Sequence, residues 1–152
     1  MTRRRPNKQE ANAMTGYTLT RTVPHPYDET VEAVRAQLAE AGFGVLTEID
    51  LKATLKEKLD VDIEPQVILG ACRPQLAYRA LGAEPSIAAL LPCNVVVRSL
   101  DESSTLVEAF DPDVMMSFAG DNAAGEALRD VASDARQRLT AALAALTDEG
   151  RS

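Results

Sequence analysis

Two cysteines, Cys72 and Cys93, are the residues of this 152-residue sequence best suited to chemistry. Cys72 closes an apolar run over residues 66–72, and Cys93 opens a second apolar run over residues 93–100. If the runs are neighbouring antiparallel strands, the thiols can approach each other; if they are parallel, the thiols lie at opposite ends of the sheet. A close pair can bind a soft metal ion such as Cu(I) or Zn(II), or cycle through a disulfide. Cys72, Cys93 and the adjacent Asn94 are therefore the candidate ligand or thiol site.

The remaining ligands of such a metal site are not evident from the sequence. A structural zinc site takes four ligands. Beyond the two thiols, the candidates are His25, Met115 and Met116, whose spacing matches no ligand motif. The alternative is that both cysteines are only small buried hydrophobic residues, a frequent role of free cysteine. The metal and any cofactor stay unidentified, with Cys72 and Cys93 as the metal-ligand candidates.

Four carboxylates offer a second kind of chemistry. Glu48, Asp50, Asp111 and Asp113 could converge as an acid–base pair or as a site for a hard metal ion. The alternative is that they lie on solvated strand faces and cap turns. The single histidine excludes a multi-histidine metal site, and no nucleophile-elbow sequence accompanies it. The sequence leaves open whether the protein is an enzyme.

The charge distribution limits the partners that the protein can have. The net charge is −7, although Arg3, Arg4, Arg5 and Lys8 make the first ten residues basic. An acidic body repels phosphate backbones, so we expect no nucleic-acid partner. No apolar run suits an export signal or a membrane span, which predicts a cytoplasmic, reducing setting without a membrane partner. We expect residues 1–15 to be a disordered basic tail and residues 16–150 to form one domain.

Hydrophobic periodicity predicts the elements that must position the cysteines. Alternation indicates strands at 17–23 and 43–51, the second of them half-buried with Phe43, Val45, Thr47, Ile49 and Leu51 on one face. Helical spacing indicates a helix over 28–41, N-capped by Asp28, and a long helix over 123–147. The other elements are short helices at 52–59 and after residue 74, and strands at 66–72, 93–100 and 105–110.

This order predicts an α+β fold, with a curved antiparallel sheet of about five strands and helices packed on one face. The sequence of elements is β-α-β-β-β-β-α with short extra helices. Both main helices are expected to dock on the same face of the sheet. Exposed edge strands invite pairing between copies, which predicts a homodimer.

Several segments of the sequence resemble the domain-of-unknown-function-302 family. The resemblance covers residues 17 to about 120, and its most specific part is the combination of GFGVLTEID at 42–50 with a later Leu-Pro-Cys. It implies a fold similar to the TATA-binding-protein-like class, often dimeric, and it supplies no agreed activity. Family members commonly carry asparagine where this chain has Arg73. The supporting segments are the first helix with Thr30, residues 67–74, Ala77, Leu81, residues 91–95 and Asp111-Pro112.

Three functions are compatible with these observations. The first is a small ligand-binding or sensing module, with a pocket between the sheet and the long helix near Cys72 and Cys93. The second is a thiol-redox or soft-metal-handling protein that uses the cysteine pair. The third is a structural homodimer without a small-molecule site.

Overall fold

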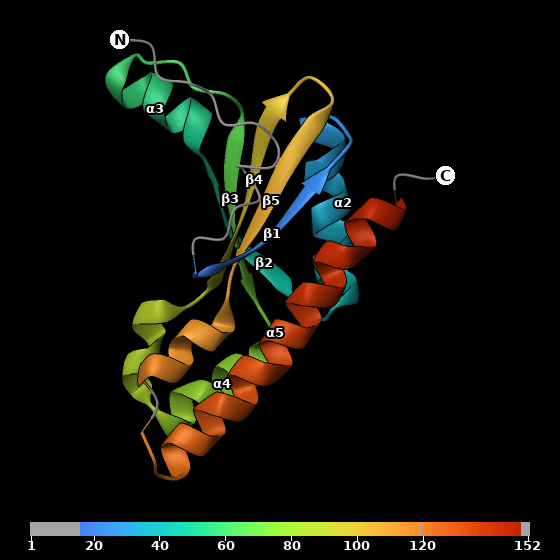
Figure 1. The fold of residues 1–152 in the computed structure, drawn as a ribbon. Helices are drawn as coiled ribbons and strands as arrows, with labels where there is room; N and C mark the ends of the chain where they lie inside the picture. Colours follow the sequence, from blue (N-terminus) through green and yellow to red (C-terminus); the bar gives the residue numbers. More distant parts are fainter. Residues whose placement is uncertain (1–15, 119, 150–152) are drawn as a thin grey trace.

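The computed structural model of the chain describes residues 16–118 and 120–149. The basic segment 1–15, predicted to be disordered, lies outside the described residues. Within them, the chain forms one antiparallel five-stranded sheet with helices packed against it (Figure 1). The predicted α+β fold class is therefore confirmed. No helix among the described residues has the length and apolar character needed to cross a membrane.

The strand order places the two cysteine-bearing strands inside the sheet. The order is β1-β5-β4-β3-β2, and every neighbouring pair is antiparallel. β4 is therefore central, β3 and β5 flank it, and β1 and β2 form the edges. The strands are β1 (Thr18–Val23), β2 (Gly44–Asp50), β3 (Gln66–Cys72), β4 (Cys93–Asp101) and β5 (Ser104–Phe110).

Two helices cover one face of the sheet, and three of the shorter ones gather at one of its ends (Figure 1). α2 (Tyr27–Glu40) and the C-terminal half of α5 (Ala123–Glu149) lie on the covered face. α4 (Pro74–Ala83) and the 3-10 helices η1 (Pro85–Leu90) and η2 (Pro112–Phe118) lie beside the N-terminal half of α5. α3 (Leu51–Leu59) projects from the opposite end of the sheet. The segment 114–120, which the sequence left undecided, is thus largely 3-10 helix.

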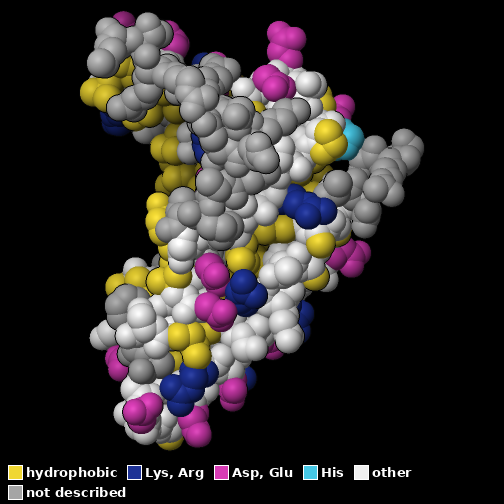
Figure 2. Space-filling view, in the orientation of Figure 1, with side chains coloured by type: hydrophobic (Ala, Val, Ile, Leu, Met, Phe, Trp, Pro, Cys, Tyr) yellow, Lys and Arg dark blue, Asp and Glu magenta, His cyan; other side chains and the backbone are white. Residues whose placement is uncertain are grey.

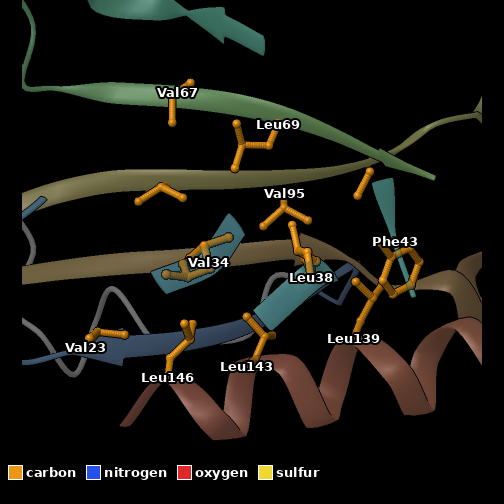
Figure 3. Packing of buried hydrophobic residues seen from close by; sticks show 14 residues of the cluster. Val23, Val34, Leu38, Phe43, Val67, Leu69, Val95, Leu139, Leu143 and Leu146 are labelled. Atoms are coloured by element: carbon orange, nitrogen blue, oxygen red, sulfur yellow. The ribbon is translucent and has the colours of Figure 1, made fainter. Parts of the chain in front are cut away.

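The hydrophobic core consists of two clusters that α5 joins. The sheet cluster lies between the sheet and α2 and α5, with Leu139, Leu143 and Leu146 pointing from α5 toward the strands (Figure 3). Because α5 has 27 residues, it is about 40 Å long and reaches both clusters. The sheet cluster contains Val23, Val34, Leu38, Phe43, Val67, Leu69, Ala71, Val95, Val97, Val107, Ala109, Leu139, Leu143 and Leu146. The end cluster contains Leu76, Ala80, Ile87, Met115, Leu128, Val131, Ala132 and Ala135.

The start of α2 differs from the prediction. Asp28 does not cap the helix, because α2 begins at Tyr27 and the N-cap position is Pro26, which makes no side-chain cap hydrogen bond. The buried Thr30 supports the first turn instead, donating its hydroxyl to the Pro26 carbonyl oxygen at 2.9 Å. Asp28 lies in the first turn, where its charge favours the helix dipole. At the other end, Gly42 has a φ of +92°, the left-handed conformation expected there.

The prediction of a half-buried strand over 43–51 is wrong about which side chains share a face and about where the strand ends. Phe43 is buried and Val45 is half-buried, but the rest of β2 is exposed. A β-bulge between Val45 and Thr47 shifts the register, so that Val45 pairs with Ala71 whereas Thr47 pairs with Gly70. One extra residue sends the following side chains to the opposite face, so Thr47 and Ile49 do not share a face with Val45. The strand ends at Asp50, and Leu51 begins α3.

Candidate functional site

The two cysteines lie on neighbouring antiparallel strands, as the sequence required for a close pair. In the register of β3 and β4, Ala71 pairs with Cys93 and Gly70 pairs with Asn94. Cys72 is therefore one residue beyond the partner of Cys93, at the same end of the sheet. Pro74 begins α4 directly after this strand, as expected for a proline at the first helical position. The turn from β3 into α4 thus fixes where Cys72 lies.

Both cysteines line one small cavity between the end of the sheet and the helices. Its volume is about 30 Å³, enough for a water-sized or ion-sized occupant. Cys93 is 8% exposed, and Cys72 is half-buried. The lining also includes Phe43 from the sheet cluster and Met115 from the end cluster, so the cavity lies where the two clusters meet.

The surroundings of both thiols favour their neutral form. Burial raises the pKa of Cys93 to about 11, and the nearby charge of Cys72 contributes in the same direction. Burial also raises the pKa of Cys72. Both side chains are free cysteines. At neutral pH both side chains are therefore thiols rather than thiolates.

Only one of the additional metal-ligand candidates lies at the cavity. Met115 lines it and is 2% exposed, whereas Met116 packs against the end cluster outside the lining. His25 lies at the other end of the sheet, where its carbonyl oxygen accepts a hydrogen bond from Thr105 Oγ1 at 2.8 Å. No group of three or more His, Cys, Asp or Glu side chains in the described part of the chain is arranged to hold a metal ion.

Asn94 is not brought together with the cysteines. It is exposed on the uncovered face of the sheet, because side chains alternate along β4 and Cys93 faces the helices. There it lines a groove of about 480 Å³ together with Gln66, Thr18 and Glu108. The Glu108 carboxylate accepts a hydrogen bond from Thr18 Oγ1 at 3.2 Å and lies 3.4 Å from Arg98 Nη2. The sequence analysis did not predict this groove. Alternation of side chains along a strand could have shown that Asn94 and Cys93 point to opposite faces of the sheet.

Arg73 is a residue at the cavity whose role the sequence did not indicate. Its Nε is buried without a hydrogen-bond partner, a condition shared in the described residues only by Ser104 Oγ. The side chain lies against Gly42, where a β-carbon would stand 3.1 Å from Nε. Glycine at this position therefore serves two needs, a left-handed turn and close approach of the arginine. An unpaired buried donor beside a cavity commonly reflects an ordered water or an anion that accepts a hydrogen bond from it.

The four candidate carboxylates have structural partners rather than a common site. Glu48 pairs with Arg35 of α2, and Asp50 Oδ1 accepts the Ala53 N–H at 2.9 Å as the N-cap of α3. Asp111 and Asp113 each lie 3.2 Å from Arg136 Nε, which ties η2 to α5. These contacts correspond to the alternative of ion pairs and caps that the sequence left open.

Comparison with known proteins identifies the family. Residues 19–146 match the family described as "Domain of unknown function DUF302". The crystal structure of an uncharacterized conserved protein DUF302 from Bacillus stearothermophilus is similar, with a TM-score of 0.72 and 31% sequence identity. The similarity covers 90% of this chain and all of that one. Among curated proteins, none matches. The five-stranded fold and the match over most of its length show that this chain belongs to the DUF302 family.

Proposed function

We propose that this protein is a small binding module that holds a soft, monovalent metal ion such as Cu(I) between Cys72 and Cys93. The supporting observation is that Cys72 and Cys93 are both among the residues that line one cavity of about 30 Å³. A volume of this size suits an ion better than a drug-sized organic ligand, so in this proposal the predicted binding module takes an ion at this place. The proposal includes the reducing, cytoplasmic setting expected from the sequence, in which both cysteines stay available as ligands.

The ligand types favour Cu(I) over Zn(II). Soft sulfur ligands select Cu(I), which does not need the four ligands of a structural zinc site. Here the cavity offers two thiols and the thioether of Met115, and the described residues supply no cluster with further His, Asp or Glu ligands. Binding releases the thiol protons, so affinity is expected to rise with pH.

The predicted alternative of thiol-redox chemistry has weaker support. A reactive cysteine has a lowered pKa, because the thiolate is the nucleophile. Burial raises the pKa of both Cys72 and Cys93, which keeps them protonated at neutral pH. The form of this alternative that remains is a slow, reversible disulfide between Cys72 and Cys93, formed with an external oxidant.

Metal titration under anaerobic, reducing conditions tests the proposal. We expect one Cu(I) per chain, measured against a competing Cu(I) chelator, and loss of binding in Cys72→Ser and in Cys93→Ser. Met115→Leu should weaken binding, whereas Met116→Leu is the matched control that leaves it unchanged. The proposal is wrong if the wild-type protein takes up no Cu(I), or if Zn(II) binds more tightly in the same competition. A thiol pair that oxidises reversibly without binding metal would favour the redox alternative.

The groove on the uncovered face supports a second candidate function, binding of a small polar molecule. Asn94 and Gln66 line it, and the side-chain amide of neither residue makes a hydrogen bond with another described residue. Its volume of about 480 Å³ lies within the usual range of small-molecule sites. Ligand-observed NMR with a fragment set tests this: hits should disappear in Asn94→Ala and persist in Cys72→Ser. A groove without hits, or hits that ignore Asn94→Ala, would exclude this candidate.

A further inference from the structure

Most of the described arginines pair with carboxylates, and Arg73 is an exception. Arg35 pairs with Glu48, and Arg98 pairs with Glu108. Several of the Lys and Arg side chains on the face shown in Figure 2 likewise lie beside Asp or Glu side chains. Within the described chain, the Arg73 side chain makes neither an ion pair nor a hydrogen bond, and its Nε is buried. A buried charged donor without a partner is costly, which points to an acceptor from outside the chain.

A second guanidinium group lies beside that of Arg73. The two meet at Gly42, where a β-carbon would stand 3.1 Å from Arg73 Nε and 3.5 Å from Arg138 Nη1. They come from different parts of the fold, since Arg73 follows β3 and precedes α4, whereas Arg138 is on α5. Two positive charges that converge on one point repel each other unless a negative charge compensates them.

One carboxylate, that of Asp134, contacts this arginine pair in the described part of the chain. Arg138 Nε donates to Asp134 Oδ1 at 2.5 Å, and Arg138 Nη1 donates to the Ala41 carbonyl oxygen at 3.0 Å. A guanidinium carries five N–H groups, so Arg138 Nη2 and the whole side chain of Arg73 remain without an acceptor there. Asp134 compensates one of the two positive charges, and the other is left over in a protein whose net charge is −7.

We propose that Arg73 and Arg138 form a binding site for a small tetrahedral oxyanion such as inorganic phosphate. Arginine suits such an anion because its planar fork offers parallel N–H donors to two oxygens at once. The anion would accept the buried Nε–H of Arg73 and the Nη2 N–H groups of Arg138, and its charge would remove their repulsion.

The surroundings of the arginine pair add to the attraction and allow access. α4 has ten residues and begins directly after Arg73, without a side-chain cap on its first turn, so its helix dipole favours an anion at this place. The side chain of Arg138 is 35% exposed, so an ion can reach the pair from solution. The site needs neither thiol, because every donor to the anion is an arginine N–H group.

Calorimetric titration with inorganic phosphate tests the proposal, with the ionic strength held constant by sodium chloride. We expect one phosphate per chain, and Arg73→Gln and Arg138→Gln should each raise its dissociation constant at least about tenfold, because charge-assisted hydrogen bonds are lost. Arg73→Lys keeps the charge but not the fork, so its affinity should lie between those of the wild type and Arg73→Gln. Arg79→Gln on α4, where the arginine side chain is 51% exposed, is the matched control and should bind normally.

Thermal unfolding separates anion binding from a merely structural role of Arg73. Phosphate should raise the Tm of the wild type and of Cys72→Ser, but not that of Arg73→Gln. The proposal is overturned if phosphate affects the wild type no more than chloride does, or if Arg73→Gln binds phosphate normally; an ordered water would then complete Arg73 Nε. Cys72→Ser is expected to lose Cu(I) and keep phosphate, so the two proposals can fail independently.

Discussion

Cys93 couples the candidate site to the stability of the fold. Burial raises its pKa from 9.0 to about 11 in the folded chain. Between these two pH values the unfolded chain loses the thiol proton while the folded chain keeps it. The stabilisation is therefore complete below about pH 9 and is lost as the pH rises through about 11, a loss of about 2–3 kcal/mol.

We expect this loss to disappear in Cys93→Ala. The measurement is the free energy of unfolding by urea at several pH values from 8 to 11, as the difference between wild type and variant. Lysines and tyrosines also titrate in this window, but they are present in both proteins and cancel. The pKa of Tyr27 is also raised, mainly by burial and to a smaller extent by Asp50. Its contribution to the pH dependence of stability can be measured separately with Tyr27→Phe. A pH-independent difference would show that Cys93 titrates normally in the folded chain.

Gly70 is the position where the uncovered face tolerates no side chain. A β-carbon there would lie 2.1 Å from Thr47 Oγ1, on the neighbouring strand β2, and 2.8 Å from Pro92 Cγ, directly before β4. We expect Gly70→Ala to lower the free energy of unfolding by about 1–3 kcal/mol, because β2 or Pro92 must move. Gly82→Ala in α4, where nothing lies within 4 Å, should instead be neutral or stabilising by up to about 1 kcal/mol. Urea denaturation of the pair checks the contrast, and equal effects would refute it.

At the scale of elements, the start of α2 depends on a buried hydroxyl rather than on a cap. Thr30 is 1% exposed and donates to the Pro26 carbonyl oxygen. Thr30→Val keeps the shape but loses this bond, so we expect a cost of about 1–2 kcal/mol in urea unfolding. Asp28→Asn is the matched control and should cost about 0.5 kcal/mol, since only an exposed charge near the helix dipole is lost. If Asp28→Asn lowers the free energy of unfolding more than Thr30→Val does, Asp28 acts as the helix cap after all.

The helices and strands also show how much of the fold could be predicted from the sequence. The apolar run over residues 93–100 and the alternation over residues 105–110 each predicted a strand, and the structure confirms both as β4 and β5. The bulge at Leu46 could not be placed, since one extra residue leaves no mark in composition and reverses every face after it. The meeting of Cys93 with Met115 depends on how α4 and η2 pack against α5, which no local pattern encodes. The sequence therefore named Cys72, Cys93 and Met115 as candidates without showing which of the three further ligand candidates lies beside the cysteines, and it did not indicate the groove around Asn94.

At the scale of the whole molecule, the cavity lies where the sheet cluster and the end cluster meet. An ion held there would bind only the folded arrangement of both clusters, so it would stabilise them together by mass action. α5 couples the clusters even without an occupant, because Leu128 contributes to the end cluster and Leu139 to the sheet cluster. Loss of packing in either cluster should therefore be transmitted to the cavity.

This coupling predicts a single unfolding transition for the whole domain. Leu128→Ala and Leu139→Ala remove buried side chains that are 3% and 1% exposed, so each should cost about 2–5 kcal/mol. In both variants we expect the reaction of Cys93 with a thiol reagent to follow the same urea midpoint as the circular dichroism of the helices. If Leu128→Ala exposes Cys93 well before the helical signal is lost, the end cluster opens on its own. The cavity would then be gated by local opening rather than by global unfolding, because α5 would have failed to bind the two clusters into one cooperative unit.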